Sequence, residues 1–203
     1  MLEGESVWNE RYSQPGYAYG TEPNQFLVSV SGRIPRSRVL SLTEGEGRNG
    51  VYLAGLGCEV TGVDGSEVGL EKAKKLAAEQ GVKISTVVAD LKDFSIEPES
   101  WDGIISIFSQ LPSAIRIPLH RAIVRGLKPG GVFVLEAFTR QQLKYGTGGP
   151  KDVDMLYSLE GLRQELAGLQ FSHAIETKRK VLEGRCHTGL ASVVQIVGVK
   201  PAA

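Results

Sequence analysis

The stretch RVLSLTEGEGRNG, residues 38–50, says most about the fold of this chain. A mostly apolar run at 39–42 stops at a loop with glycine at positions 45, 47 and 50, and a helical pattern follows. A second apolar run leads to the sequence GVDGS at 62–66, so an acid, Asp64, stands at the end of the next strand. Strand, glycine loop, helix, strand and acid form the unit that holds an adenosine-containing cofactor, in which the acid accepts hydrogen bonds from the ribose hydroxyls.

The glycine spacing alone fits more than one ligand. It matches the dinucleotide fingerprint that binds NAD, and a tight strand-to-helix turn without any ligand would use the same residues. Two carboxylates inside the loop, Glu44 and Glu46, argue against a pyrophosphate, which favours a helix N-terminus free of competing negative charge. S-adenosyl-L-methionine carries a sulfonium cation and an amino group instead. The acidic loop therefore favours S-adenosyl-L-methionine as the cofactor.

The composition argues against several classes of function. The 203 residues carry 23 Lys and Arg and 23 Asp and Glu, so the formal net charge is zero and no basic stripe for a nucleic acid is present. The apolar stretches are too short to span a bilayer, and the first residues lack the features of a signal peptide. Cys58 and Cys186 form no metal-spaced cluster. We expect a cytoplasmic protein with free thiols that acts on a small molecule, with no metal, nucleic acid, membrane or protein partner.

Helices and strands alternate along the first two thirds of the chain. Helices predicted at 6–12 and 23–34 would form an N-terminal helical cap over residues 1–35, and residues 36–203 would form the cofactor-binding core of the same single domain. Strands are predicted at 38–42, 58–63, 83–88, 102–108 and 131–137. Helices are predicted between them at 48–57, 66–80 and 116–127. This alternation implies a parallel sheet with right-handed crossovers.

The pattern changes after residue 138. A glycine-rich loop at 144–154 and a helix at 158–168 precede two strands, at 171–182 and 190–199, whose short link predicts an antiparallel hairpin. The expected fold class is α/β: a single Rossmann-like domain with a seven-stranded, mostly parallel sheet, a C-terminal antiparallel hairpin and helices on both faces. If the first hairpin strand runs parallel to the earlier five, the link at 183–189 lies at the ligand-binding edge.

Three further stretches extend the cofactor pattern. The run VVADL at 87–91 ends the third predicted strand with an acid, Asp90, which fits the amino group of an adenine. The run WDGIISIF at 101–108 falls on the fourth strand, and LKPGGVF at 127–133 forms the turn before the fifth. With the glycine loop, these motifs resemble the class I methyltransferase superfamily over roughly residues 36–140. The resemblance implies S-adenosyl-L-methionine as the cofactor, with the fourth strand beside its methionine part.

The expected cofactor contacts lie at the ends of the predicted strands. Because ligands bind beyond the carboxyl ends of parallel strands, these residues are expected to meet at one edge of the sheet. They are Glu44, Gly45, Gly47, Asp64, Gly65, Ser66, Asp90, Leu91 and Phe108.

A narrower resemblance covers nearly the whole chain. The segments WNERY at 8–12 and YAYGTEPNQFL at 17–27, and the tail GRCHTGLASVVQ at 184–195, are similar to the tellurite-resistance and thiopurine methyltransferase-like branch. This similarity implies methyl transfer to small soft nucleophiles: thiols, or oxyanions of selenium and tellurium. The chain departs from the branch at Ser41, where many relatives have an acid, and at Thr43-Glu44, which replaces Gly-Cys or a similar pair.

The hairpin link supplies the candidate catalytic residues. Arg185 offers two hydrogen bonds to an oxyanion, and His187 offers a base or a donor near neutral pH. A lone histidine in a hairpin is, however, usually a surface residue. Tyr19 and Tyr145 are candidate substrate residues, because a tyrosine ring suits a lid over a sulfonium, although both also fit simple loop anchors.

Two other functions remain open from the sequence. The first is an NAD(P)-dependent oxidoreductase, against which no Tyr-x-x-x-Lys pair occurs and no second catalytic domain fits in 203 residues. The second is a binding module that keeps a pocket for S-adenosyl-L-methionine without catalysis, since Ser41 and Thr43 change the pocket motif.

Overall fold

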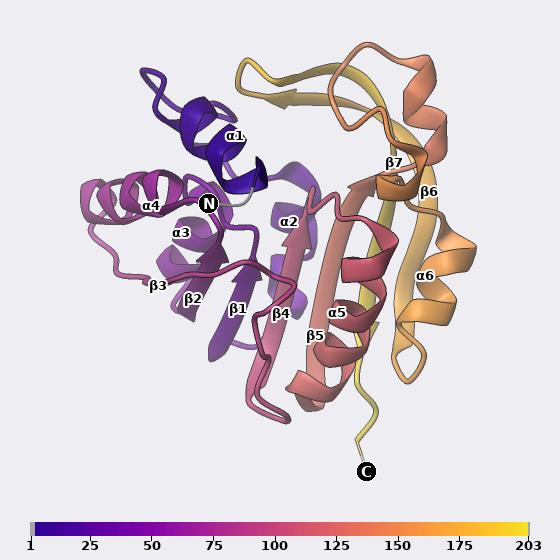
Figure 1. Cartoon of the computed structure of the whole chain (residues 1–203). Coiled ribbons are helices and arrows are strands. Elements are labelled where there is room, and N and C mark those ends of the chain that lie inside the picture. The colour runs from indigo at the N-terminus through magenta and orange to yellow at the C-terminus, as the bar shows by residue number, and fades with distance from the viewer. Residues whose placement is uncertain (1–2, 203) are drawn as a thin grey trace.

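The computed structural model describes residues 3–202 of the chain (Figure 1). Its centre is a seven-stranded sheet in the order β3-β2-β1-β4-β5-β7-β6. The strands are β1 Arg38–Leu42, β2 Glu59–Asp64, β3 Ser85–Val88, β4 Trp101–Ile107, β5 Leu127–Phe138, β6 Gln170–Glu183 and β7 His187–Val199. The first five pair in parallel, and β7 pairs antiparallel with both β5 and β6. The predicted fold class and the antiparallel hairpin are confirmed.

Helices cover both faces of the sheet. They are α1 Glu3–Tyr12, α2 Gln25–Val30, α3 Arg48–Gly55, α4 Glu67–Glu79, α5 Ser113–Gly126 and α6 Leu159–Glu165, with 3-10 turns at Ser31–Arg33, Arg140–Lys144 and Val153–Met155. Within residues 3–202, no helix has both the length and the apolar character needed to cross a membrane.

The alternation of side chains along the strands builds two cores. On β1, Leu40 and Leu42 pack into the core that α5 and α6 cover, whereas Val39 packs into the core that α2 and α3 cover. Successive residues of a strand point to opposite faces, so a strand buried on both sides needs apolar residues throughout. Because helices cover both faces of the sheet, a ligand has access to it at its edges.

The hairpin of β6 and β7 continues beyond the rest of the sheet. β5 pairs with β7 only as far as Phe138↔Val193, whereas β6 and β7 remain paired up to Glu183↔His187. This extension curls over the carboxyl edge of the sheet toward the N-terminal segment (Figure 1). The backbone N–H of Arg185 donates to the carbonyl of Ala18 there, at 3.1 Å.

Several element boundaries differ from those predicted, and two of the differences bear on the cavity. The helix expected at 23–34 is divided into α2 and a 3-10 turn, with Asn24 capping α2 by accepting a hydrogen bond from the N–H of Leu27. The expected hairpin link at 183–189 is shorter, because strand pairing continues to Glu183 and His187. Side-chain polarity suggested a loop there, but the cross-strand hydrogen bonds hold these polar residues in the ladder.

Candidate active site

A cavity of about 920 Å³ opens at the carboxyl edge of the sheet. The loops that follow β1, β2, β3 and β4 form its floor, and α1, the segment around Tyr19 and the hairpin tip form its roof. This volume lies at the upper end of the range for small-molecule sites. The strand ends, the glycine loop and the hairpin therefore meet at one cavity.

The glycine loop takes a backbone path that side chains would block. Gly45 and Gly47 have φ of 58° and 97°, in the region that favours glycine. A Cβ on Gly47 would lie 2.7 Å from Cα of Ala73, and one on Gly45 would lie 2.8 Å from the hydroxyl oxygen of Tyr12. The loop is thus pressed between α4 and α1, with Gly45 on the cavity wall and Gly47 behind it.

Asp64 is the buried acid at the end of β2. Its Oδ2 accepts from the N–H of Gly45 at 2.9 Å and its Oδ1 from the N–H of Ser66 at 2.8 Å. Burial raises the pKa of Asp64, and the two backbone hydrogen bonds oppose that rise. Each oxygen of a carboxylate can accept a second hydrogen bond. The group is therefore held in place on the cavity wall and can accept from a diol.

Glu44 fills the space beneath the glycine loop. Its Oε1 accepts from the N–H of Gly50 at 2.9 Å, and its Oε2 accepts from the hydroxyl of Ser41. A Cβ on Gly62 would lie 2.7 Å from Cγ of Glu44, so glycine at that position makes room for the side chain. Burial raises the pKa of Glu44 to about 7.

Glu46 joins the loop to its neighbours. Its Oε2 accepts from the N–H of Ala18 at 2.7 Å, and its Oε1 pairs with Nζ of Lys72 at 2.9 Å. Nζ of Lys72 also donates to the carbonyl oxygens of Gln14 and Gly16. Both loop carboxylates thus reach the cavity wall but serve chiefly to hold the loop and the N-terminal segment.

The ends of β3 and β4 complete the floor. Asp90 lies on the wall beside the buried Leu91, and its Oδ1 accepts from the N–H of Lys92 at 2.9 Å. Phe108, after β4, has φ of 53°, which a non-glycine residue seldom adopts. Its N–H donates to the carbonyl of Glu136 at 2.7 Å, which holds the strained backbone in place.

Three aromatic rings surround His187 inside the cavity. The centroid of its ring lies 4.6 Å from that of Tyr19, 4.9 Å from that of Phe108 and 5.1 Å from that of Phe138. The histidine is buried, and all four residues line the cavity. His187 is therefore a buried residue of the cavity wall, and its catalytic role stays a prediction.

Gly65 also lies on the cavity wall, whereas Arg185, Tyr145 and Ser66 lie outside it. The guanidinium of Arg185 is exposed and donates to the carbonyl of Pro15 at 3.4 Å. The expectation that Arg185 faces the site is not met, because its side chain lies at the surface and not on the cavity wall. Tyr145 is half-buried away from the wall. Ser66 caps α4 by accepting from the N–H of Gly69 at 3.0 Å.

Several wall residues were not anticipated from the sequence. They are Trp8, Arg11, Tyr12, Arg48, Asn49, Gln110, Phe138 and Met155. The first three come from α1, and the aromatic residues at 8 and 12 stack at 5.6 Å between ring centroids. Their one-turn spacing was the available signal, since it places both rings on one face of a short helix.

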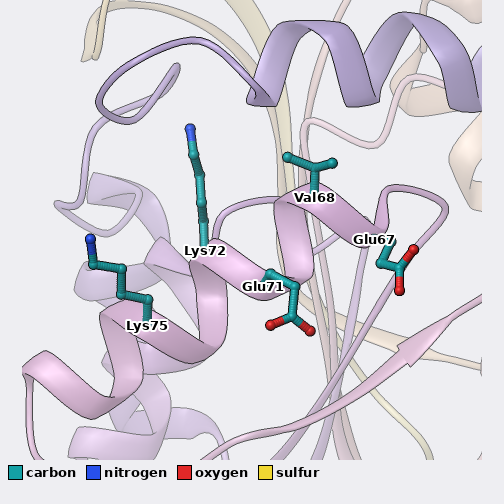
Figure 2. A pocket seen from close by; sticks show the side chains of 5 residues that line it. All are labelled: Glu67, Val68, Glu71, Lys72 and Lys75. Carbon is teal, nitrogen blue, oxygen red and sulfur yellow. The ribbon is translucent and has the colours of Figure 1, made fainter.

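A second, open hollow of about 450 Å³ lies against α4 (Figure 2). The residues that line it all belong to this helix: Glu67, Val68, Glu71, Lys72 and Lys75. Figure 2 shows Val68 and Lys72 pointing toward the N-terminal segment and Glu71 pointing away from it. Because these side chains do not converge on a common point, we place the functional site in the larger cavity.

Known proteins match both the sequence and the fold. Residues 39–131 match the family model described as a methyltransferase domain. The 2-heptyl-1-hydroxyquinolin-4(1H)-one methyltransferase of Mycobacteroides abscessus is 26% identical over 70% of this chain and 63% of its own length. The uncharacterized methyltransferase YodH of Bacillus subtilis is 34% identical over 66% of this chain and 55% of its own. The chain thus spans roughly three fifths of the length of the curated relatives it matches.

Two solved structures share nearly the whole fold. One, described as the conversion of a disulfide bond into a thioacetal group during echinomycin biosynthesis, has a TM-score of 0.78 and 20% identity and covers 98% of this chain and 93% of its own. TehB from Haemophilus influenzae has a TM-score of 0.72 and 19% identity and covers 97% of this chain and 66% of its own. Residues 39–131 thus match a methyltransferase domain, and the chain shares its fold with structures described as S-adenosylmethionine-dependent methyltransferases.

Proposed function

We propose that the chain is an active S-adenosyl-L-methionine-dependent methyltransferase whose acceptor is a small soft nucleophile, a thiol or an oxyanion of selenium or tellurium. The main support for this proposal is that the wall of one cavity has two chemically different parts. One part has the glycine loop, Asp64 and Asp90 on its wall, and the other has His187 among three aromatic rings. A methyl donor and an acceptor need adjoining sites of this kind.

The acid-lined part fits the cofactor. The fixed carboxylate of Asp64 suits a ribose diol, Asp90 suits an adenine amino group, and the backbone around Gly45 admits close approach. When bound, the cofactor supplies a methyl group activated by a cationic sulfur. The remaining proposed contacts are Glu44, Gly65, Leu91 and Phe108 on the wall, with Gly47 and Ser66 shaping the loops behind it. Residues 1–35 supply Trp8, Tyr12 and Tyr19 to the roof, which supports their proposed role as a cap.

The aromatic part fits a soft acceptor. Aromatic rings attract a polarizable sulfur atom, and a water-excluding wall strengthens a sulfur nucleophile by removing its hydration. Tyr19, Phe108 and Phe138 each contribute one ring. The ring centroids of Phe108 and Phe138 lie 4.5 Å apart. One of the similar solved structures is described as the conversion of a disulfide bond into a thioacetal group, which supports an acceptor that reacts at sulfur. TehB shares the same fold.

An aromatic hydroxyl compound is the second candidate acceptor. The M. abscessus relative is named for a hydroxyquinolinone, and flat rings also stack well between aromatic side chains. The same cavity would then hold a ring in place of a thiol.

A methyl-transfer assay distinguishes these possibilities. The purified chain is incubated with S-adenosyl-L-methionine and, in turn, an aromatic thiol, an alkyl thiol, selenite, tellurite and a hydroxyquinoline, and methylated product and S-adenosylhomocysteine are measured by mass spectrometry. We expect thiols to be methylated fastest. Turnover of the hydroxyquinoline alone would favour the second candidate. Binding of the cofactor by calorimetry without turnover of any acceptor would favour a binding module.

A further inference from the structure

The ring of His187 has a defined orientation at the hairpin tip. Its Nδ1 lies 3.4 Å from Oε2 of Glu183, the residue that faces it in the β6–β7 ladder. The opposite edge of the ring lies beside Gly148, where an added Cβ would be 3.4 Å from Nε2 and 2.7 Å from Cδ2. Gly148 lines the cavity. One ring nitrogen thus faces a carboxylate, and the other lies on the cavity side.

Glu183 is fixed by its own partners. Its Oε2 pairs with Nη2 of Arg48 at 2.8 Å, and its Oε1 accepts from Nδ2 of Asn24 at 2.8 Å. Arg179 lies 3.4 Å from the same Oε1. Burial alone would raise the pKa of Glu183, but the hydrogen bond with His187 and the charge of Arg48 outweigh it and hold that pKa at about 2. The carboxylate is therefore an anion that can only accept hydrogen bonds.

An anion facing Nδ1 decides where the neutral imidazole carries its proton. The proton belongs on Nδ1, where it can be donated to Glu183, and Nε2 is left with a free lone pair. Among residues 3–202, Nε2 has no hydrogen-bond partner. The ring is further held by Tyr19, Phe108 and Phe138.

We propose that Glu183 is a positioning residue that presents Nε2 of His187 as the base for an acceptor thiol, which enters the cavity protonated. This inference rests on the proposed function and narrows its acceptor class to thiols. The S–H bond of the acceptor breaks, its proton moves to Nε2, and its electron pair stays on sulfur. That sulfur forms a bond to the methyl carbon while the bond between this carbon and the cofactor sulfur breaks, so that neutral S-adenosylhomocysteine leaves. The proton then passes from Nε2 to water.

The charges around His187 favour a neutral acceptor over an oxyanion. Glu183 from β6 and Tyr19 from the loop after α1 contact its ring, Cys186 precedes it on the cavity wall, and Arg48 from α3 pairs with the same oxygen of Glu183. The guanidinium of Arg48 is paired with Glu183, and that of Arg11 donates to the hydroxyl of Tyr19 at 2.8 Å. These two guanidinium groups are therefore already engaged by protein groups, and Arg179 pairs with Glu136 and Glu183. A protonated thiol enters this site without needing a counter-ion.

Two thiols of different acidity test the role of Glu183. 4-Nitrothiophenol is ionised near neutral pH and needs no base, whereas benzyl mercaptan is protonated and does. We expect Glu183→Gln to lower kcat for benzyl mercaptan about tenfold or more, a share of the hundredfold or greater effect typical of proton transfer. For 4-nitrothiophenol the same variant should change kcat by less than about threefold. The matched control is Glu176→Gln, the exposed glutamate of β6, which should leave both rates unchanged.

The tautomer provides a readout independent of activity. Nitrogen-15 NMR of the three histidines in the cofactor-free protein, assigned for residue 187 with His187→Gln, should place the proton on Nδ1 in the original chain. A proton on Nε2 would overturn the inference, even if Glu183→Gln does not fold. Equal losses with both thiols in Glu183→Gln, or no loss with either, would overturn it while thiol methylation by the original chain still stands. If the original chain methylates no thiol, the proposed acceptor class itself fails.

Discussion

The carboxylate of Glu44 accepts a hydrogen bond from the hydroxyl of Ser41, three residues earlier in the chain. Both are positions at which the sequence departs from the branch that it resembles, and in the structure the two side chains meet. An acid is absent from the strand at position 41, and the acid at 44 turns back to the same place, where it also holds the N–H of Gly50. The glycine loop thus keeps a buried carboxyl group beneath it.

The buried Glu44 predicts a pH-dependent stability. Its pKa rises from 4.5 to about 7 on folding, so its contribution to the free energy of unfolding is fully present below about pH 4.5 and is lost as the pH rises through 7. Glu44→Gln cannot ionise and retains both hydrogen bonds. Its stability relative to the original chain should therefore increase by roughly 3 kcal/mol between pH 4.5 and pH 8, as measured by urea unfolding. Glu59→Gln, an exposed glutamate, is the control, and a constant difference for Glu44→Gln would contradict the prediction.

Asp64 should decide cofactor affinity. Asp64→Asn removes the negative charge that would accept the ribose hydroxyls, and hydrogen bonds to a charged group contribute about 1.5–3 kcal/mol. We expect the dissociation constant for S-adenosyl-L-methionine to rise about tenfold to hundredfold in calorimetric titration. Asp93→Asn, which alters an exposed acid near the same edge, should bind normally. Unchanged binding by a folded Asp64→Asn would remove this residue from the site.

Asp90 should recognise the adenine amino group. An inosyl analogue of S-adenosylhomocysteine offers an acceptor oxygen in place of that group, so it should bind the original chain weakly. Asp90→Asn supplies both a donor and an acceptor and should reduce the difference between the adenosyl and inosyl ligands. Competition binding measures the ratio of the two dissociation constants. A ratio near one for the original chain would show that Asp90 does not contact the base.

We expect substitutions of His187 and Arg185 to affect turnover differently, although the two residues are only two positions apart. His187 lies in the cavity, whereas the side chain of Arg185 is exposed. His187→Gln should lower kcat for a protonated thiol about a hundredfold with cofactor affinity nearly unchanged, and Arg185→Gln should leave both quantities unaltered. Steady-state kinetics and calorimetry on the two variants provide the measurement. A loss of turnover in Arg185→Gln would show that the hairpin tip rearranges when substrate binds.

Much of the fold was predictable because it follows local rules. Alternating strands and helices predict the parallel sheet, and the two polar-linked strands at the C-terminal end predict the hairpin. Asp64 and Asp90 were identifiable because residues that follow strand ends of a parallel sheet share one edge, whatever the details of packing. Their position depends on chain order alone.

The rest of the site depends on packing between distant segments. Arg48, Glu183 and Asn24 meet only because the hairpin extends past the sheet and lies over the glycine loop. The sequence also could not separate Arg185 from His187, since the two-residue alternation of a strand is broken at the turn. The inward direction of Phe108 rests on its left-handed backbone, for which the residue type gives no signal.

The strand order places a constraint on how the molecule is made. β7 follows β6 in the chain, yet it lies between β5 and β6 in the sheet. During synthesis β6 therefore has no neighbouring strand until β7 has left the ribosome, and Glu183 cannot face His187 before that moment. The glycine loop and the first five strands can assemble earlier. The strand order thus allows the proposed cofactor pocket to form before the last strand completes the proposed acceptor site.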